Sequence, residues 1–168
     1  MSAKTDVRVL IKELEKSLAV LDKMHAFYES YTKTLPPASQ RTTENAIVLA
    51  EILTNFYTCL ETIFLRISQF FENSLRKDRW HQDLLEKMTL SIENLREAVI
   101  SDSAAKHLAE FLRFRHFRRY YFTFEYDPDR LEMLRIKYET TFLMVKSDLN
   151  RFLLFLDNLS SSSDHSPP

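Results

Sequence analysis

The chain has 168 residues, of which 45% are hydrophobic and 28% are charged, and this is the size and composition of one globular domain. It contains no glycine, which excludes phosphate-binding loops, dinucleotide-binding turns and nucleophile elbows, because these rely on glycine for positive φ or close backbone approach. The net charge of −1 means that any affinity for nucleic acid must come from a local patch. A single cysteine, Cys59, can form neither an internal disulfide nor a thiolate metal site, which fits a reducing cytosol.

Neither a signal peptide nor a membrane span is expected. Residues 1–30 are rich in charge from the start and have no apolar core of the kind that a signal peptide needs. The longest apolar stretch is interrupted at Arg66 and falls short of the roughly 20 residues that a membrane span needs. We therefore expect a cytoplasmic protein with no membrane partner.

The first predicted helix covers residues 5–34. Its apolar residues recur at steps of three and four, which is typical of a helix that packs in a bundle: Val7, Ile11, Leu14, Leu18, Leu21 and Tyr28. Prolines end this helix, and Thr42 or Thr43 is the candidate N-cap of a second one over residues 44–75. At 1.5 Å per residue the second helix would be roughly 45 Å long, long enough to be the spine of the bundle.

A third helix is predicted over residues 81–99. Its apolar residues keep a helical spacing: Leu84, Leu85, Met88, Ile92 and Leu95. Trp80 and His81 are expected to attach the start of this helix to the bundle. Asp102 or Ser103 is the candidate N-cap of a fourth helix that ends near residue 124.

The motif EYDPDR predicts the start of a fifth helix, with Asp127 as cap and Pro128 at the first helical position. This helix reaches about residue 159, and no stretch of the chain alternates with a period of two. The expected fold is therefore all-α, a single up-and-down bundle of about five helices over residues 1–159. Residues 160–168 are expected to form a disordered Ser/Pro tail.

The segment FLRFRHFRRYYF, residues 111–122, combines four arginines, a histidine and six aromatic residues inside the fourth predicted helix. At 100° per residue one broad stripe of this helix begins apolar and becomes cationic: Leu108, Phe111, Leu112, Arg115, Arg119 and Phe122. Guanidinium groups on a core-facing stripe indicate a cleft that binds an anion. The anion would be an acidic side chain, a partner subunit or a phosphate.

His116 lies among the four arginines Arg113, Arg115, Arg118 and Arg119. Cleavage of a phosphodiester needs a group that transfers a proton and groups that stabilise charge on the phosphate. An imidazole can do the first and neighbouring arginines the second. The alternative interpretation is a solvated basic helix with aromatic residues packed behind it. The phenylalanines are expected to pack in the core, whereas phenols beside arginines could bind phosphate or be modified.

The five histidines do not predict a metal site. No two of them are three or four residues apart, the spacing that places two ligands on one helix face: His25, His81, His107, His116 and His165. We expect no metal and no other cofactor.

The runs WHQDLLEKM and LAEFLRFRHFRRYYFTFEYDPDRL, together with FYTCLETIFLRISQFF, resemble the HepT-like branch of the HEPN superfamily over residues 45–135. The resemblance implies an all-helical homodimer that is the toxin of a toxin–antitoxin pair and cleaves RNA without metal. It also implies a nucleotidyltransferase (MNT) antitoxin, which silences the toxin by transferring AMP to a tyrosine.

The family's signature is an arginine, four to six residues, a histidine, one residue and a tyrosine, with the arginine and histidine facing a cleft between protomers. Arg115 matches the arginine, but Tyr120 stands at the histidine position and Phe122 at the tyrosine position. The same spacing from Arg76 to His81 crosses an expected helix boundary, lacks the tyrosine and is treated as chance.

Two hypotheses follow from this partial match. In the first, the chain is a HepT-like endoribonuclease with catalytic candidates Arg115, His116 and Tyr120, phosphate-binding candidates Arg113, Arg118 and Arg119, and Tyr121 or Tyr120 as the tyrosine modified. In the second, it is a degenerate HEPN-fold interaction protein without nuclease activity, whose arginines pair with acidic residues across a dimer. The candidate acidic partners are Glu61, Glu93 and Glu110.

Overall fold

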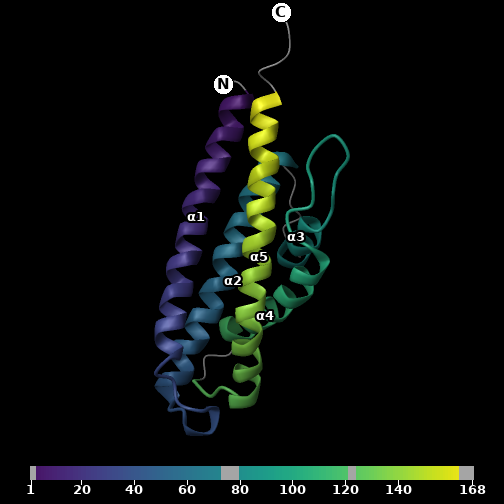
Figure 1. Ribbon diagram of the computed structural model, residues 1–168. Coiled ribbons are helices and arrows are strands. Elements are labelled where there is room, and N and C mark those ends of the chain that lie inside the picture. Colours follow the sequence, from purple (N-terminus) through teal and green to yellow (C-terminus); the bar gives the residue numbers. More distant parts are fainter. Residues whose placement is uncertain (1–2, 73–79, 121–123, 163–168) are drawn as a thin grey trace, which may run out of the picture.

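The computed structural model describes residues 3–72, 80–120 and 124–162 (Figure 1). Within these ranges the chain forms five α-helices and a short 3-10 helix, Ala38–Gln40: α1 (Ala3–Thr32), α2 (Thr43–Phe71), α3 (Trp80–Met88), α4 (Asp102–Tyr120) and α5 (Pro128–Ser162). The β-type pairing in the described residues is limited to an isolated bridge between Ile92 and Arg96. The all-α fold expected from the sequence is confirmed.

The three long helices α1, α2 and α5 contact one another and form the body of the bundle (Figure 1). The shorter α3 and α4 pack against α2, and α4 also packs against α5. Figure 1 shows that α1 and α4 run in one direction and α2 and α5 in the other, which is an up-and-down arrangement. Because α2 contacts each of the other four helices, it is the central element.

The core is continuous through the bundle and contains most of the apolar positions that predict the helices. On α2 the buried residues cover a broad part of the circumference, as expected for a helix with neighbours on several sides: Leu49, Ala50, Ile52, Leu53, Phe56, Tyr57, Leu60, Ile63, Phe64 and Ile67. On α4 the buried side chains are Ala104, Leu108, Phe111, Leu112 and Phe114.

α2 is the described helix that is long and apolar enough to cross a membrane, by length and composition alone. However, 56% of its most apolar stretch is buried inside the protein, and a central bundle helix passes the same test. Arg66, the charge that interrupts this stretch, donates a 2.8 Å hydrogen bond from Nη1 to Ser17 Oγ of α1. The helix is thus part of the bundle's own packing.

The starts of α2 and α5 are capped as the sequence predicts. The Thr42 hydroxyl accepts a hydrogen bond from the backbone N–H of Asn45, and the Asn45 side chain accepts one from the backbone N–H of Thr42. At α5, Asp127 Oδ1 accepts hydrogen bonds from the backbone N–H groups of Asp129 and Arg130. Both ends therefore follow from local chemistry. α5 continues to Ser162, beyond the expected end near residue 159.

The predicted cap of α4 was wrong by one residue. Ser101, not Asp102 or Ser103, accepts the hydrogen bond from the backbone N–H of Ala104 with its hydroxyl, at 3.2 Å. The same hydroxyl donates to Asp148 Oδ2 of α5 at 2.9 Å, and that carboxylate also accepts from the Ser101 N–H. The contact with α5 decides which of the consecutive polar residues caps the helix.

The predicted end of the third helix was also wrong, because α3 ends at Met88 and residues 89–101 form an irregular loop. Arg96 is buried in this loop, where its guanidinium donates to the backbone carbonyls of Leu90 and Lys87, each at 2.8 Å. Its Nη2 also pairs with Glu72 at the end of α2, at 2.5 Å. These bonds require the chain to turn back where helical spacing alone would continue α3.

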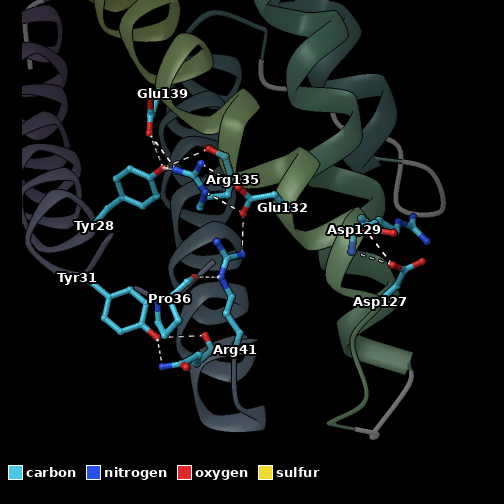
Figure 2. Close-up of polar contacts among 11 residues, drawn as sticks. Tyr28, Tyr31, Pro36, Arg41, Asp127, Asp129, Glu132, Arg135 and Glu139 are labelled. Carbon is cyan, nitrogen blue, oxygen red and sulfur yellow. Dashed lines mark hydrogen bonds and ion pairs between the residues drawn. The ribbon is translucent and has the colours of Figure 1, made fainter. Parts of the chain in front are cut away.

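Ion pairs and hydrogen bonds connect the helices at the end of the bundle where α2 and α5 begin (Figure 2). Glu132 of α5 pairs with Arg41 at 2.6 Å and with Arg135 at 2.9 Å. The Tyr28 hydroxyl of α1 donates to Glu139 at 3.0 Å. This network connects α1, the residues before α2, and α5.

Candidate functional site

The arginine and aromatic segment of α4 begins inside the core and leaves it near Arg115. Phe111 and Phe114 are buried, and the side chain of Arg115 is 17% exposed. This stripe therefore changes from apolar to cationic at Arg115, where it is still covered by α2 and α3, as the helical spacing predicts. Arg119, which the spacing places on the same stripe, is exposed. A guanidinium in such a place needs an anionic partner.

The anionic partner of Arg115 is Glu61 of α2. Arg115 Nη1 lies 3.2 Å from Glu61 Oε2, and Arg115 Nε donates to Thr58 Oγ1 at 3.2 Å. Among the described residues these two ion-pair atoms make no hydrogen bond, so charge attraction holds them together. Thr58 and Glu61 are three residues apart on α2, which places both on the face that meets α4. The arginine is thus neutralised within its own chain.

The second oxygen of Glu61 contacts an imidazole from a third helix. Glu61 Oε1 lies within hydrogen-bond distance of Nδ1 of His81, at the start of α3. The side chain of Glu61 is only 5% exposed, whereas that of His81 is 17% exposed. We call Glu61, His81, Arg115 and His116 the Glu61 cluster. One buried carboxylate in this cluster positions a guanidinium from α4 and an imidazole from α3.

His81 and His116 are neighbours in space. Their ring centroids are 5.3 Å apart and their planes are nearly perpendicular, at 86°. Burial lowers the pKa of His116 below its ordinary value of 6.5, and the positive charges of His81 and Arg115 lower it further. His116 is therefore mostly neutral at pH 7, the form in which an imidazole accepts a proton.

A cavity of about 490 Å³ lies between α3 and α4 and reaches His116. Cationic and acidic side chains line it together: Lys106, Arg113 and His116 beside Glu86 and Asp102. The remaining wall is formed by residues such as Leu85, Ala109 and Leu112. The other three members of the Glu61 cluster do not line the cavity, so His116 is the residue that joins the two.

A family model of HepT-like proteins matches residues 48–156, nearly two thirds of the chain. The chain belongs to the HepT-like family. Comparison with curated proteins and with solved structures found no matching relative. The matched residues run from Val48, within α2, to Leu156 of α5 and include all four residues of the Glu61 cluster.

The four arginines of this HepT-like segment have different surroundings. Arg118 donates from Nη1 to Glu51 at 2.8 Å, to Thr54 Oγ1 at 3.1 Å, and from Nε to the Tyr126 hydroxyl at 3.1 Å. Arg118 therefore attaches the end of α4 to α2. Arg113 and Arg119 are exposed, and Arg113 lines the cavity. These two side chains are the cations of the segment that reach solvent most freely.

The two tyrosine candidates lie at the edge of the described chain. Tyr120 is the last residue of α4. The structure describes its backbone as helical but does not describe its side chain. Tyr121 and Phe122 lie outside the described residues. Among the residues that the structure describes, no group of three or more His, Cys, Asp or Glu side chains is placed to hold a metal ion.

Helical spacing does not predict the position of His81 in this HepT-like site. The expectation that His81 attaches the start of α3 to the bundle agrees with its contact with Glu61. Its packing against His116 joins two different helices, so the spacing of histidines along one helix cannot reveal it. The spacing from Arg76 to His81 was the available hint, and Arg76 lies outside the described residues.

Proposed function

We propose that this HepT-like protein is the toxin of a toxin–antitoxin pair and cleaves RNA in the cytoplasm without a metal ion. The observation that carries the proposal is the environment of His116. Its imidazole has a lowered pKa, packs beside a second imidazole and reaches a cavity that also contains Arg113 and Lys106. A neutral base beside exposed cations suits a polyanion whose backbone carries a reactive hydroxyl.

The reaction that these groups support is an internal transesterification. His116 removes the proton of a ribose 2′-hydroxyl, whose oxygen then attacks the adjacent phosphorus. The bond from phosphorus to the 5′-oxygen breaks, and the 5′-oxygen takes up a proton. The products are a 2′,3′-cyclic phosphate and a 5′-hydroxyl, with no water or metal consumed. Arg113 and Arg119 would bind the phosphates on either side of the cleaved bond.

Arg115 has a different part in this proposal. Because its Nη1 atom is buried against Glu61, it stabilises charge at the edge of the site and is not a freely available phosphate ligand. Arg118 attaches α4 to α2 through Glu51 and Thr54, so its proposed role is structural.

The partners proposed are a second copy of the chain and a nucleotidyltransferase antitoxin. Their support is membership of the HepT-like family. Tyr120 or Tyr121 would accept AMP, since each has a phenol close in sequence to the arginines. Co-expression with the nucleotidyltransferase from a neighbouring gene, followed by mass spectrometry, tests this part. An added mass of AMP on either tyrosine is expected, and AMP on another residue alone would contradict the assignment.

The nuclease proposal is tested with purified protein and structured RNA in buffer that contains EDTA. We expect cleavage by the wild type and a loss of about 10²- to 10⁴-fold in His116→Asn, as is typical when a general base is removed. His107→Asn is the matched control, because His107 also lies on α4 but contacts Thr141 of α5 at 3.1 Å. Equal residual cleavage by the wild type and His116→Asn would refute the proposed nuclease activity.

A second candidate function is a HEPN-fold interaction protein without nuclease activity. The observation that favours it is the Arg115–Glu61 pair, because it shows a signature arginine already neutralised inside one chain. This candidate predicts no RNA cleavage by the wild type, together with a large loss of thermal stability in Arg115→Ala.

A further inference from the structure

The cavity between α3 and α4 contains more charged side chains than the proposed cleavage reaction uses. We infer that this cavity binds the base of the nucleotide whose 2′-hydroxyl faces His116, and that Glu86 selects guanine there. The inference rests on the proposed function, because it names the base preference of the same site. The proposed function does not need it, since a nuclease can cleave RNA without any base preference.

The first argument is the order of the residues along the cavity. The start of α3 meets the end of α4, where His81 packs against His116, and the end of α3 meets the start of α4, where Met88 accepts a hydrogen bond from the N–H of Ile100. The two helices are therefore antiparallel. Lys106 precedes His116 by ten residues on α4, which is roughly 15 Å of helix. The cavity thus has a His116 end and an opposite end where α3 stops and α4 begins.

The opposite end is rich in hydrogen-bond acceptors. Glu86 lies in the last turn of α3 and Asp102 is the first residue of α4, and both line the cavity. The Thr89 hydroxyl, which also lines it, donates its proton to the Glu86 carbonyl at 2.8 Å and is left as an acceptor. Lys106 is the donor at this end. A ligand that binds here must therefore present several N–H donors.

These charges are available to a ligand. Within the described part of the chain, the side chains of Glu86, Asp102 and Lys106 form no ion pair, and all three residues are exposed. By contrast, Arg115 and Arg118 of α4 are paired with acids of α2. Opposite charges that share a cavity without pairing leave room for a ligand that has both donors and acceptors.

Guanine is the RNA base whose edge matches this pattern. Its Watson–Crick edge has two adjacent N–H donors, on N1 and N2, beside the acceptor O6. Adenine and cytosine have one amino donor beside an unprotonated ring nitrogen, and uracil has one ring N–H between two carbonyls. A carboxylate accepts from two parallel donors, so it favours guanine and repels the lone pairs of the other three. Glu86 would accept from N1 and N2 while Lys106, on the opposite wall, donates to O6.

The middle of the cavity suits the faces of a flat base. Ala105 and Ala109, one turn apart on α4, line it with small side chains, and Leu85 and Leu112 provide apolar surface. The volume of about 490 Å³ lies within the range of pockets that hold small ligands. A base between these walls would have its Watson–Crick edge at the acceptor-rich end and its ribose toward His116.

The first test changes the base and needs no protein variant. The full-length protein cleaves structured RNA in EDTA, and sequencing of the new 5′-hydroxyl ends identifies the nucleotide on the 5′ side of each cleaved bond. We expect guanosine there. Replacing it by adenosine at one such bond should lower kcat/KM by about 10- to 100-fold. Inosine, which lacks the amino group, should lower it less, and 7-deazaguanosine, which keeps the whole Watson–Crick edge, should leave it unchanged.

The second test changes the proposed specificity residue. In Glu86→Gln an amide with one donor and one acceptor replaces the carboxylate, and this pattern matches the edge of adenine. We expect kcat/KM at guanosine to fall about 10- to 100-fold and the preference to shift toward adenosine. Glu97→Gln is the matched control, because Glu97 is an exposed acid of the loop after α3 and does not line the cavity. It should keep the preference of the wild type.

Three results would overturn the inference. They are cleavage without preference at the 5′ nucleotide, equal cleavage of guanosine and inosine, and a guanosine preference that is unchanged in Glu86→Gln. Each leaves the proposed function intact if His116→Asn is inactive on the same RNA. A wild type that cleaves no RNA refutes both. A general loss of structure in Glu86→Gln would lower cleavage at every base alike, so a shift from guanosine to adenosine separates specificity from folding.

Discussion

Nη1 of Arg115 lies 3.2 Å from Oε2 of the buried Glu61, so Arg115, which matches the arginine of the expected signature, is paired inside its own chain. The guanidinium that the sequence places on a core-facing stripe of α4 is therefore paired with a carboxylate from α2. The same acid contacts His81, which joins three helices at one carboxylate. Stability and proposed chemistry share this contact, so a variant of Arg115 changes both.

The first prediction concerns the stability of this pair. Arg115→Met should lower the free energy of unfolding by about 3 kcal/mol, because it leaves a buried carboxylate with one cationic partner fewer. Arg115→Met combined with Glu61→Gln should cost less than the sum of the two single changes, since no charge is then left unpaired. Urea denaturation of the wild type, the two single variants and the double variant measures the coupling energy between the two residues. Strict additivity would mean that the ion pair contributes no net stability.

The sequence predicted the long helices well because their determinants are local. α1, α2 and α5 have apolar residues at helical spacing, and Thr42 and Asp127 cap the starts of α2 and α5 with side chains that lie beside them in the chain. The end of α3 could not be predicted in this way. Ile92 fits the helical period, but Arg96 donates to the carbonyl of Lys87 in α3 and pairs with Glu72. Helical spacing contains no information on those contacts.

The site was predicted only in part for the same reason. The neighbourhood of Arg115 and His116 follows from their order in one helix. The partnership of Arg115 with Glu61 was one of several open possibilities, and the sequence led us to expect it across a dimer, not within one chain. The contact of His81 with His116 joins α3 and α4 across an irregular loop, so no spacing rule for a single helix could find it.

The second prediction concerns the pH dependence of the Arg96–Glu72 pair. Burial raises the pKa of Glu72, but the hydrogen bonds from Arg96 and Lys87 outweigh it, and the pKa stays below its ordinary value of 4.5. The stabilising contribution of Glu72 is thus fully present above pH 4.5 and is lost as the pH falls through the lowered pKa. The unfolding free energy of wild type and Glu72→Gln, measured from pH 7 to pH 3, should converge toward the acid end. A constant difference would contradict the pairing.

The third prediction is the titration of His116. Its NMR resonance should have a midpoint below 6.5, because burial and two neighbouring cations disfavour the imidazolium. Between that midpoint and 6.5 the unfolded chain binds more protons, so stability should fall as the pH is lowered through this window. In His81→Asn the midpoint should rise part of the way, since one cation is removed while burial remains. A midpoint at or above 6.5 in the wild type would contradict the described environment.

The fourth prediction separates the exposed arginines from the anchored one. Arg113→Ala and Arg119→Ala should weaken RNA binding, and each should reduce the salt slope of the binding constant by about 0.7, the value for one lost contact with single-stranded RNA. Arg118→Ala should mainly lower the melting temperature, because its guanidinium binds Glu51, Thr54 and Tyr126. Fluorescence anisotropy at several salt concentrations measures the slopes. An Arg118→Ala protein that is stable but has a reduced slope would reverse this assignment.

The fifth prediction concerns Asn94, which has a φ of 60° in a chain without glycine. It lies in the turn where the Ile92 N–H donates to the Arg96 carbonyl at 2.8 Å, so its backbone helps to place the buried Arg96. A side chain with Cβ is strained in this left-handed region, and asparagine is one of the few residues that tolerate it. Asn94→Ala should therefore lower the free energy of unfolding by about 1 kcal/mol, whereas Asn94→Gly should stay within about 0.5 kcal/mol of the wild type.

The control is Glu93→Ala, a change at the exposed neighbouring residue, and the measurement is urea denaturation. Equal losses for Asn94→Ala and Asn94→Gly would show that the asparagine side chain, and not its backbone angle, stabilises the turn.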